Sequence, residues 1–318
     1  MKKNEVNIID KFKLLTFNNK RSLNLDDDIY YDSKLKLTYS IDTFEEDIHF
    51  LNSENPERFV KKIFRSSISD ILSKGSIPIV YFISLSVKKI NEKWINVFRN
   101  ELLKESNKFN VYLGGGDTIK SKKLSVSISF IGHANKKPIL RTGAKKNDDI
   151  YITGYLGDSF IGLQIIKKKL NLGKFNKFFI KSYEEPSLPY KFSKFLSKFA
   201  TSSIDISDGF IKDLKTVCNV SKCGALIDFL SIPFSKQARI SAKNKKIKLT
   251  EVFSNGDDFQ TLFTAKPQYR NLIKSISNQT NVKISRVGVI TLKKNVKIVN
   301  GDKIVSLSGD KTGYIHKF

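Results

Sequence analysis

Several aspartates in this sequence stand where a strand is expected to end. Asp42 follows the alternating segment 36–41, and Asp117 follows a short apolar segment and three glycines. Asp205 and Asp208 flank Ser207, where an apolar strand gives way to a helix. Ligands of α/β folds bind at the carboxyl ends of strands. These positions therefore favour a ligand site built from carboxylates.

Two further groups of carboxylates suit a structural role poorly. At 100° per residue, Asp70 falls beside Phe59 and Ile63, at the edge of an apolar helix stripe. A buried carboxylate there costs several kcal/mol unless it is paired or binds a metal. The run Asp26-Asp27-Asp28 places three carboxylates side by side, and their repulsion disfavours ionising all of them unless a cation is present.

Together these carboxylates indicate a site for hard cations. Mg²⁺ takes oxygen ligands and typically works through a few carboxylates plus substrate phosphates. The glycines 114–116 would let backbone N–H groups approach a phosphate closely. The P-loop pattern GxxxxGK[ST] is absent. The residues alone predict Mg²⁺-dependent phosphate chemistry on another scaffold. A helix cap for Asp208, a turn for Asp117 and a surface cluster for 26–28 are structural interpretations that stay open.

The elements expected to position these residues alternate between strands and helices. Asn55-Pro56 reads as N-cap and first helical residue and Gly75 as the stop of a helix. A buried strand is expected over 77–87, a helix over 91–108, a short strand over 111–113 and a half-buried strand over 124–130. The second half is expected to continue with helices near 158–169, 188–199 and 267–278, and strands near 150–153, 225–230, 258–265 and 282–291.

The chain has 318 residues, which suggests two domains of mixed α/β (α+β) structure. Segment 136–149 is the best boundary candidate and predicts domains over 1–140 and 141–318. A hydrophobic fraction of 40% excludes a disordered chain. The longest apolar stretch, 77–87, is too short to span a bilayer, and the N-terminal segment lacks the apolar run of a secretory signal. We expect a cytoplasmic protein with no membrane partner.

The net charge of +25 resembles that of a nucleic-acid-binding protein. However, only 8 of the 56 basic residues are Arg, the side chain suited to bidentate phosphate and base contacts. The lysines are spread along the chain, and we interpret them as a solvated surface rather than a nucleic-acid footprint. Cys218 and Cys223 form neither a zinc pattern nor a redox CxxC motif.

Motifs in order along most of the chain resemble those of the thiamine-monophosphate kinases, in the superfamily of aminoimidazole ribonucleotide synthetase and selenophosphate synthetase. The matching segments are Ser40-Ile41-Asp42-Thr43 to His49-Phe50 (STDT…HF), Ser69 to Pro78 (SD(I/L)AAMGA.P), Gly115-Gly116-Asp117-Thr118 (GGDT), Arg141 to Gly154 (R(S/T)GAKPGD.(I/V)YVTG), Ile204 to Gly209 ((M/I)D(I/L)SDG), Asn255 to Phe259 (GGEDYEL) and Gly313 to Phe318 (G(W/F/Y)DHF).

The resemblance implies a two-domain PurM-like fold, with an N-terminal domain whose sheet forms a homodimer and a C-terminal α/β sandwich. It implies transfer of the γ-phosphoryl group of ATP to thiamine phosphate, with several Mg²⁺ ions. The implied metal ligands are Asp28, Ser40, Asp42, Asp70, Asp117, Asp205 and Asp208. The implied ATP contacts are Gly116, Asp117, Arg141 and Ser207, and the implied thiamine phosphate contacts are His49, Asp257 and Tyr314. No side chain is expected to act as a general base.

The sequence departs from the family pattern at a few positions. The family's GIGDD appears as Asn24-Leu25-Asp26-Asp27-Asp28, without either glycine, and Ile41 and Asp257 replace a Thr and a Glu. The nearest rival interpretation is another ATP-using member of the superfamily, although a selenophosphate synthetase needs a reactive Cys or selenocysteine near its N-terminus and the first Cys here is Cys218. A basic nucleic-acid-binding protein and a non-catalytic scaffold are two more distant hypotheses.

Overall fold

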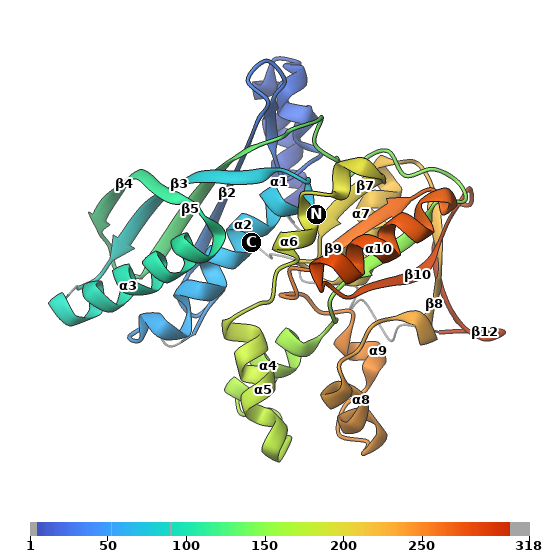
Figure 1. Ribbon diagram of the computed structural model, residues 1–318. Coiled ribbons are helices and arrows are strands. Elements are labelled where there is room, and N and C mark those ends of the chain that lie inside the picture. Colours follow the sequence, from blue (N-terminus) through green and yellow to red (C-terminus); the bar gives the residue numbers. More distant parts are fainter. Residues whose placement is uncertain (1–4, 52, 90, 306–318) are drawn as a thin grey trace.

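The computed structural model describes residues 5–51, 53–89 and 91–305, and it contains two mixed sheets flanked by helices (Figure 1). The first sheet has the strand order β1-β2-β5-β3-β4 and the second the order β12-β11-β8-β10-β6-β9-β7. Their strands are β1 (Tyr30–Asp32), β2 (Leu37–Glu45), β3 (Ile77–Val87), β4 (Tyr112–Lys120), β5 (Ser125–His133), β6 (Asp149–Thr153), β7 (Ala200–Asp205), β8 (Gly224–Asp228), β9 (Thr261–Ala265), β10 (Ile284–Thr291), β11 (Val296–Asn300) and β12 (Lys303–Ile304).

Helices cover one face of the first sheet and both faces of the second. The α-helices are α1 (Glu5–Phe12), α2 (Val60–Ser73), α3 (Glu92–Phe109), α4 (Asp158–Ile166), α5 (Asn176–Glu184), α6 (Tyr190–Ser193), α7 (Phe210–Val220), α8 (Lys236–Lys243), α9 (Leu249–Val252) and α10 (Arg270–Thr280). The 3-10 helices are η1 (Lys13–Thr16), η2 (Lys20–Leu25), η3 (Pro56–Arg58), η4 (Gly173–Phe175), η5 (Leu196–Lys198), η6 (Phe229–Ser231) and η7 (Pro267–Tyr269). None of the helices in the described ranges is both long and apolar enough to cross a membrane.

The two faces of the first sheet differ because apolar and small polar side chains alternate along its strands. On β5, Val126, Ile128 and Phe130 are fully buried and belong to the core that includes residues of α2 and α3. The serines between them point to the other face, in keeping with the period of two along a strand. That second face carries exposed apolar side chains, among them Ile41 and Phe82. The half-buried strand expected over 124–130 is confirmed.

The second sheet separates two apolar cores. Ile150 and Ile152 of β6 belong to the larger one, which includes α7, whereas Tyr151 faces the smaller one together with residues of α6 and α10. Alternate residues of one fully buried strand thus serve both cores, as expected for a sheet covered by helices on both faces.

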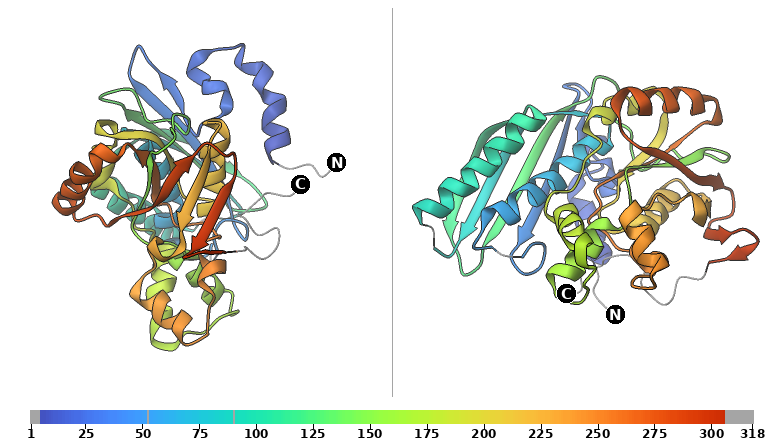
Figure 2. Two further views of the ribbon diagram at one scale, coloured as in Figure 1. Left: turned by 90° about the vertical axis from the view of Figure 1, so that its right-hand side faces the viewer. Right: turned by 60° about the horizontal axis from the view of Figure 1, so that its bottom comes forward.

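Helix α2 lies at the junction of the two sheets (Figures 1 and 2). It contacts β2 and β5 on one side and β7 on the other. Twelve of its 14 residues are buried, so the helix is packed on nearly all sides. Gly75, at a φ of +70°, ends the helix in a conformation that favours glycine.

Most expected elements of the first half are confirmed. The strand β3 coincides with 77–87, and Asn55 caps η3, which leads into α2. Two expectations about strand ends are wrong. Strand β2 continues to Glu45, so Asp42 lies inside it, and the glycines 114–116 form no loop because they lie within β4. Glycines adopt extended backbone when a neighbouring strand supplies hydrogen bonds, and here β3 pairs with β4 in parallel.

In the second half the helix expected over 188–199 is also wrong as a single element. It is divided into α6 and η5, because the chain turns at Lys194 and Phe195 to bury Phe192, Leu196 and Phe199 in the smaller core. The domain boundary at 140/141 stays a prediction. It falls between β5, the last strand of the first sheet, and β6, the first strand of the second.

A buried ion pair joins α2 to α3. The Arg65 guanidinium donates from Nε and Nη2 to the two carboxylate oxygens of Glu105 at 2.6 and 2.7 Å, and from Nη1 to the Pro186 carbonyl at 3.1 Å. We expect Glu105→Gln to lower the free energy of unfolding by about 3 kcal/mol, because it leaves a buried guanidinium uncompensated.

Chemical denaturation measures this loss. The double substitution Arg65→Met with Glu105→Leu removes both charges and should recover most of the stability. A Glu105→Gln protein as stable as the wild type would show that the ion pair does not hold α3 on α2.

Candidate active site

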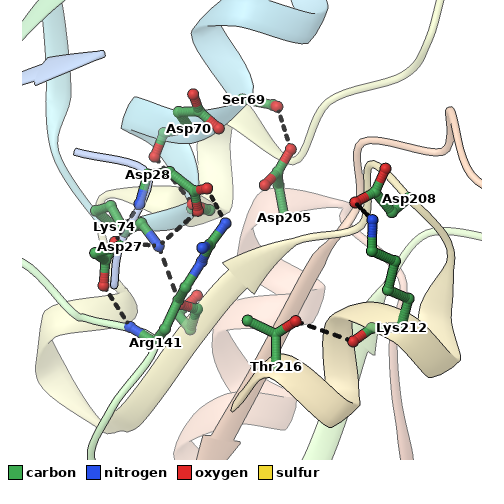
Figure 3. A network of polar contacts seen from close by, with 12 residues as sticks. Asp27, Asp28, Ser69, Asp70, Lys74, Arg141, Asp205, Asp208, Lys212 and Thr216 are labelled. Atoms are coloured by element: carbon green, nitrogen blue, oxygen red, sulfur yellow. Dashed lines mark hydrogen bonds and ion pairs between the residues drawn. The ribbon is translucent and has the colours of Figure 1, made fainter. Parts of the chain in front are cut away.

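Three carboxylates from distant parts of the chain meet beside α2. Asp28 follows η2, Asp70 is on α2 and Asp205 ends β7, and ligand oxygens of all three lie within 4.8 Å of one another (Figure 3). The Ser69 hydroxyl donates to Asp205 Oδ2 at 2.6 Å. Asp70 is half-buried at the apolar edge of α2, so the expectation of a buried carboxylate there is confirmed only in part. Burial and the charges of Asp42 and Asp205 raise its pKa well above the usual range.

Asp42 and Ser40 on β2 extend this group. Their partners on β5 are Ile128 and Phe130, which are buried against α2, so both side chains leave the sheet on that same face. Burial and the charge of Asp205 raise the pKa of Asp42 to about 7, against a small opposing effect of the Ser67 hydroxyl. Burial also raises the pKa of Asp205. Among the described residues, the buried Ser40 hydroxyl has no hydrogen-bond partner.

Two cations lie among the carboxylates. Lys74 Nζ is 2.8 Å from Asp27 Oδ1 and 3.3 Å from Asp28 Oδ2. The Arg141 guanidinium forms an ion pair with Asp28, and the Arg141 backbone N–H donates to Asp27 Oδ2 at 2.7 Å. In Figure 3 both cationic side chains point toward Asp28. We call these five carboxylates, Asp27, Asp28, Asp42, Asp70 and Asp205, the acidic cluster.

The run 26–28 does not act as one unit. Asp26 is exposed and accepts from Lys13 at 3.0 Å and from Asn24 at 3.1 Å, away from the acidic cluster. The hypothesis of a cation site formed by all three is therefore wrong in this respect, because the chain turns between Asp26 and Asp27. Asn24 has a φ of +58°, where the family pattern has glycine, and Asn is among the residues that tolerate this conformation.

Asp208 and Ser207 lie in the turn between β7 and α7. Asp208 forms an ion pair with Lys212 at 2.5 Å, and its charge acts on Asp205. The Ser207 carbonyl accepts from the Asp257 N–H at 2.8 Å, which joins this turn to the segment before β9. Asp208 does not cap α7: the N-cap residue is Gly209, whose N–H donates to Asp213 inside the helix at 3.1 Å.

Asp257 and His49 define a second region nearer the N-terminal end of α2. Asp257 Oδ1 is 2.8 Å from Nζ of Lys62, a buried residue of α2 that also lies over the ring of Tyr183 at 3.7 Å. The Tyr183 hydroxyl in turn donates to the His49 carbonyl at 3.2 Å. His49 Nδ1 accepts from the Glu45 N–H. Tyr314, the third expected thiamine phosphate contact, lies outside the described residues.

Asp117 and Gly116 are not brought to the acidic cluster. Along the sheet, Asp117 is in register with Ser84, Ser127 and Thr43, whereas Asp42 is in register with Ile128 and Ile83. Neighbours in register point to the same face, so Asp42 and Asp117 leave opposite faces. Three strand spacings, about 14 Å, separate Asp117 from the strand of Asp42. Asp117 is exposed on an edge strand.

Sequence reasoning missed Lys62 and Lys74. Both are buried on a helix otherwise recognised from its apolar stripe, and a lysine in so basic a chain gives no signal by itself. A comparison with the motif SD(I/L)AAMGA.P could have identified Lys74, because the motif has an uncharged Met at this position. Nothing comparable marks Lys62.

The residues present fit divalent cations. The acidic cluster supplies carboxylate oxygens, and the orphaned Ser40 hydroxyl adds a neutral oxygen on the same face, which is the ligand chemistry that Mg²⁺ prefers. A cavity of about 530 Å³ lies beside Asp27 and Asp28 and is lined also by Tyr39, Ile41 and Phe82. Its size and apolar walls suit a small organic ligand next to the carboxylates.

The raised pKa values predict an unusual dependence of stability on pH. The folded Asp42 binds a proton up to about pH 7, whereas the unfolded group releases it near the ordinary pKa of an aspartate, 3.8. The metal-free protein should therefore lose stability as the pH rises from about 4 to 7, because the folded state binds more protons in this window. Asp42→Asn should flatten this slope, and Mg²⁺ should restore stability at pH 7.5. Melting temperatures in EDTA and in Mg²⁺ would test this, and a metal-free protein more stable at pH 7 than at pH 5 would contradict it.

Comparisons with known proteins agree with this geometry. Residues 25–134 match the family model "AIR synthase related protein, N-terminal domain". The chain is 32% identical to a thiamine-monophosphate kinase of Buchnera aphidicola from Acyrthosiphon pisum, with 99% of each chain covered, and 33% identical to that of Buchnera aphidicola from Schizaphis graminum, with 88% and 87% covered.

The fold agrees as well. A solved structure of AaThiL complexed with AMPPCP and TMP superposes with a TM-score of 0.84 at 24% identity, covering 98% of this chain and 97% of that one. This match confirms the PurM-like fold expected from the motifs. With a relative above 30% identity along the whole length, and with the family's acidic motifs beside α2, the chain belongs to the thiamine-monophosphate kinase family.

Proposed function

We propose that this protein phosphorylates thiamine phosphate with ATP in the cytosol, giving thiamine diphosphate and ADP. A terminal oxygen of thiamine phosphate attacks the γ-phosphorus, a new P–O–P bond forms, and the bond from the γ-phosphorus to the bridging oxygen breaks. The observation that carries the proposal is the identity to a thiamine-monophosphate kinase over 99% of the chain. The AaThiL structure, complexed with AMPPCP and TMP, supports ATP and thiamine phosphate as the two substrates.

The acidic cluster supports a role in holding the polyphosphate through metal ions. Mg²⁺ bound by carboxylates neutralises charge on the transferred phosphoryl group and on both phosphate chains. We propose several Mg²⁺ ions, because seven protein ligands together with phosphate oxygens exceed the six positions of one octahedral Mg²⁺ ion. The proposed ligands are Asp28, Ser40, Asp42, Asp70, Asp117, Asp205 and Asp208. Gly116, Asp117, Arg141 and Ser207 are the proposed contacts of ATP.

The acceptor requires no general base. The second pKa of a phosphate ester is about 6, so thiamine phosphate carries a nucleophilic oxygen at neutral pH. The Tyr183 hydroxyl lies beside His49 in the proposed acceptor region, and burial raises the pKa of this phenol, so it stays protonated. The residues His49, Asp257 and Tyr314 are the proposed contacts of thiamine phosphate. Lys62 holds Asp257 in place.

The position of Asp117 supports a homodimer. Asp42 and Asp117 of one chain leave opposite faces of the sheet, so they cannot serve one metal site together. A second copy packed on the face away from α2 would place its own Asp117 next to the cavity that Ile41 and Phe82 line together with Asp27 and Asp28 of the first copy. Exposed apolar residues on that face, Ile41, Phe82 and Ile119, suit such an interface. The proposal is a dimer whose sites each use residues of both copies.

Asp42→Asn tests the chemical part of the proposal. An amide cannot replace a metal-binding carboxylate, so thiamine diphosphate formation from ATP, thiamine phosphate and Mg²⁺ should fall about a hundredfold or more while the fold is kept. Asp47→Asn changes an exposed carboxylate of the loop after β2 and should leave the rate unchanged. The proposal fails if the wild type forms no thiamine diphosphate.

A subunit-mixing experiment tests the shared site. Asp42→Asn and Asp117→Asn should each be inactive alone. After unfolding and refolding together in equal amounts, half of the dimers contain one chain of each kind, and one of their two sites is intact, so about a quarter of the wild-type activity should return. Recovery to no more than the level of the separate variants would mean that both residues act within one chain.

A further inference from the structure

Lys74 is the most enclosed charge of the site. The side chain is fully buried at the end of α2, and its ammonium nitrogen is 2.8 Å from Asp27, 3.3 Å from Asp28 and 3.2 Å from the Ser203 carbonyl. An ammonium group has three donors, and these three acceptors use all of them. The lysine is therefore held at a fixed position, unlike a solvated side chain at the surface.

The ammonium lies between carboxylates that come from different elements. It contacts the loop carboxylates directly, and its charge opposes the rise in pKa that burial causes at Asp70 on α2 and at Asp205 on β7. The single charge of Lys74 thus acts on the loop carboxylates and also on those of α2 and β7. This is the electrostatic position of a bound cation rather than of a peripheral ion pair.

The buried charge of Lys74 reduces the net negative charge of the acidic cluster. Within the part of the chain that the structure describes, five carboxylates face two cations, Lys74 and Arg141, so this set of charges is negative but less so than the carboxylates alone would make it. In the motif SD(I/L)AAMGA.P the position of Lys74 holds Met, an uncharged side chain of similar length. Relative to that motif, this chain has gained a buried positive charge in the site.

We infer that Lys74 is a built-in cation that takes the place of one divalent ion in the acidic cluster. The inference rests on the proposed function, since it concerns the metal ions of that same site. Asp27 and one side of Asp28 are occupied by the ammonium and are closed to a metal ion. The wild-type protein therefore binds one divalent cation fewer than the same chain with a neutral residue at position 74.

Counting bound metal tests the inference without enzyme activity. Mn²⁺ alone, titrated into the full chain and followed by electron paramagnetic resonance, gives the number of bound ions per chain. Lys74→Met and Lys74→Gln should each bind one Mn²⁺ more than the wild type. Lys61→Met removes the same group from the same helix, where Lys61 pairs with Glu185 at 2.6 Å outside the cluster, and should leave the number unchanged.

Melting temperatures separate this role from a structural one. In EDTA, Lys74→Met should melt below the wild type, because unpaired buried carboxylates remain, and Mn²⁺ should remove most of the difference. A lysine with only a structural role would lower the melting temperature equally with and without Mn²⁺. Equal numbers of bound Mn²⁺ in the wild type and in both Lys74 variants would overturn the inference.

The number of bound Mn²⁺ ions and the formation of thiamine diphosphate test the two proposals separately. A wild type that forms thiamine diphosphate while the three proteins bind equal numbers of Mn²⁺ refutes the role of Lys74 and leaves the kinase activity standing. A wild type that forms no thiamine diphosphate contradicts the proposed function. In that case an additional Mn²⁺ in both Lys74 variants still supports the inference.

Discussion

Repulsion among the buried and half-buried carboxylates of the acidic cluster is the constraint on which the rest of this structure depends. Burial raises the pKa values of Asp42 and Asp70, and the charges of neighbouring members of the acidic cluster raise them further. Such a group is stable only with protons, cations or both. The surrounding elements supply compensating features: α2 contributes the Ser69 hydroxyl and leads into Lys74, and the segment after β5 contributes Arg141. Charge interactions as well as apolar packing therefore stabilise the junction of the two sheets.

The sequence predicts those features of the fold and site that residues near one another in the chain determine. The place of Asp70 at the edge of the apolar stripe follows from helix periodicity, and β3 follows from an unbroken apolar segment. The conformation of the glycines 114–116 could not be predicted, because pairing with β3, some 30 residues earlier, decides between loop and strand. The separation of Asp26 from Asp27 and Asp28 likewise depends on Lys74 and Arg141, which are distant in sequence.

The first sheet uses its two faces for different tasks. One face packs against α2 and presents Asp42 and Ser40, and the other presents serines, exposed apolar residues and Asp117. A strand with alternating small polar and large apolar residues makes this possible, because a change on one face leaves the packing of the other intact. The motif residues Asp42 on β2 and Asp117 on β4 are both proposed metal ligands, yet they lie on different surfaces of a single chain.

The long separation between parts of the acidic cluster has a consequence for folding during synthesis. The Ser69–Asp205 bond spans 136 residues, which at ribosomal rates takes roughly 7–27 s to translate, whereas Lys74 and Asp28 are only 46 residues apart. The first sheet and α2 are therefore complete on the ribosome well before β7 exists. During that interval Lys74 already neutralises part of the charge of Asp27 and Asp28, so the emerging half can bury their loop before the second sheet is complete.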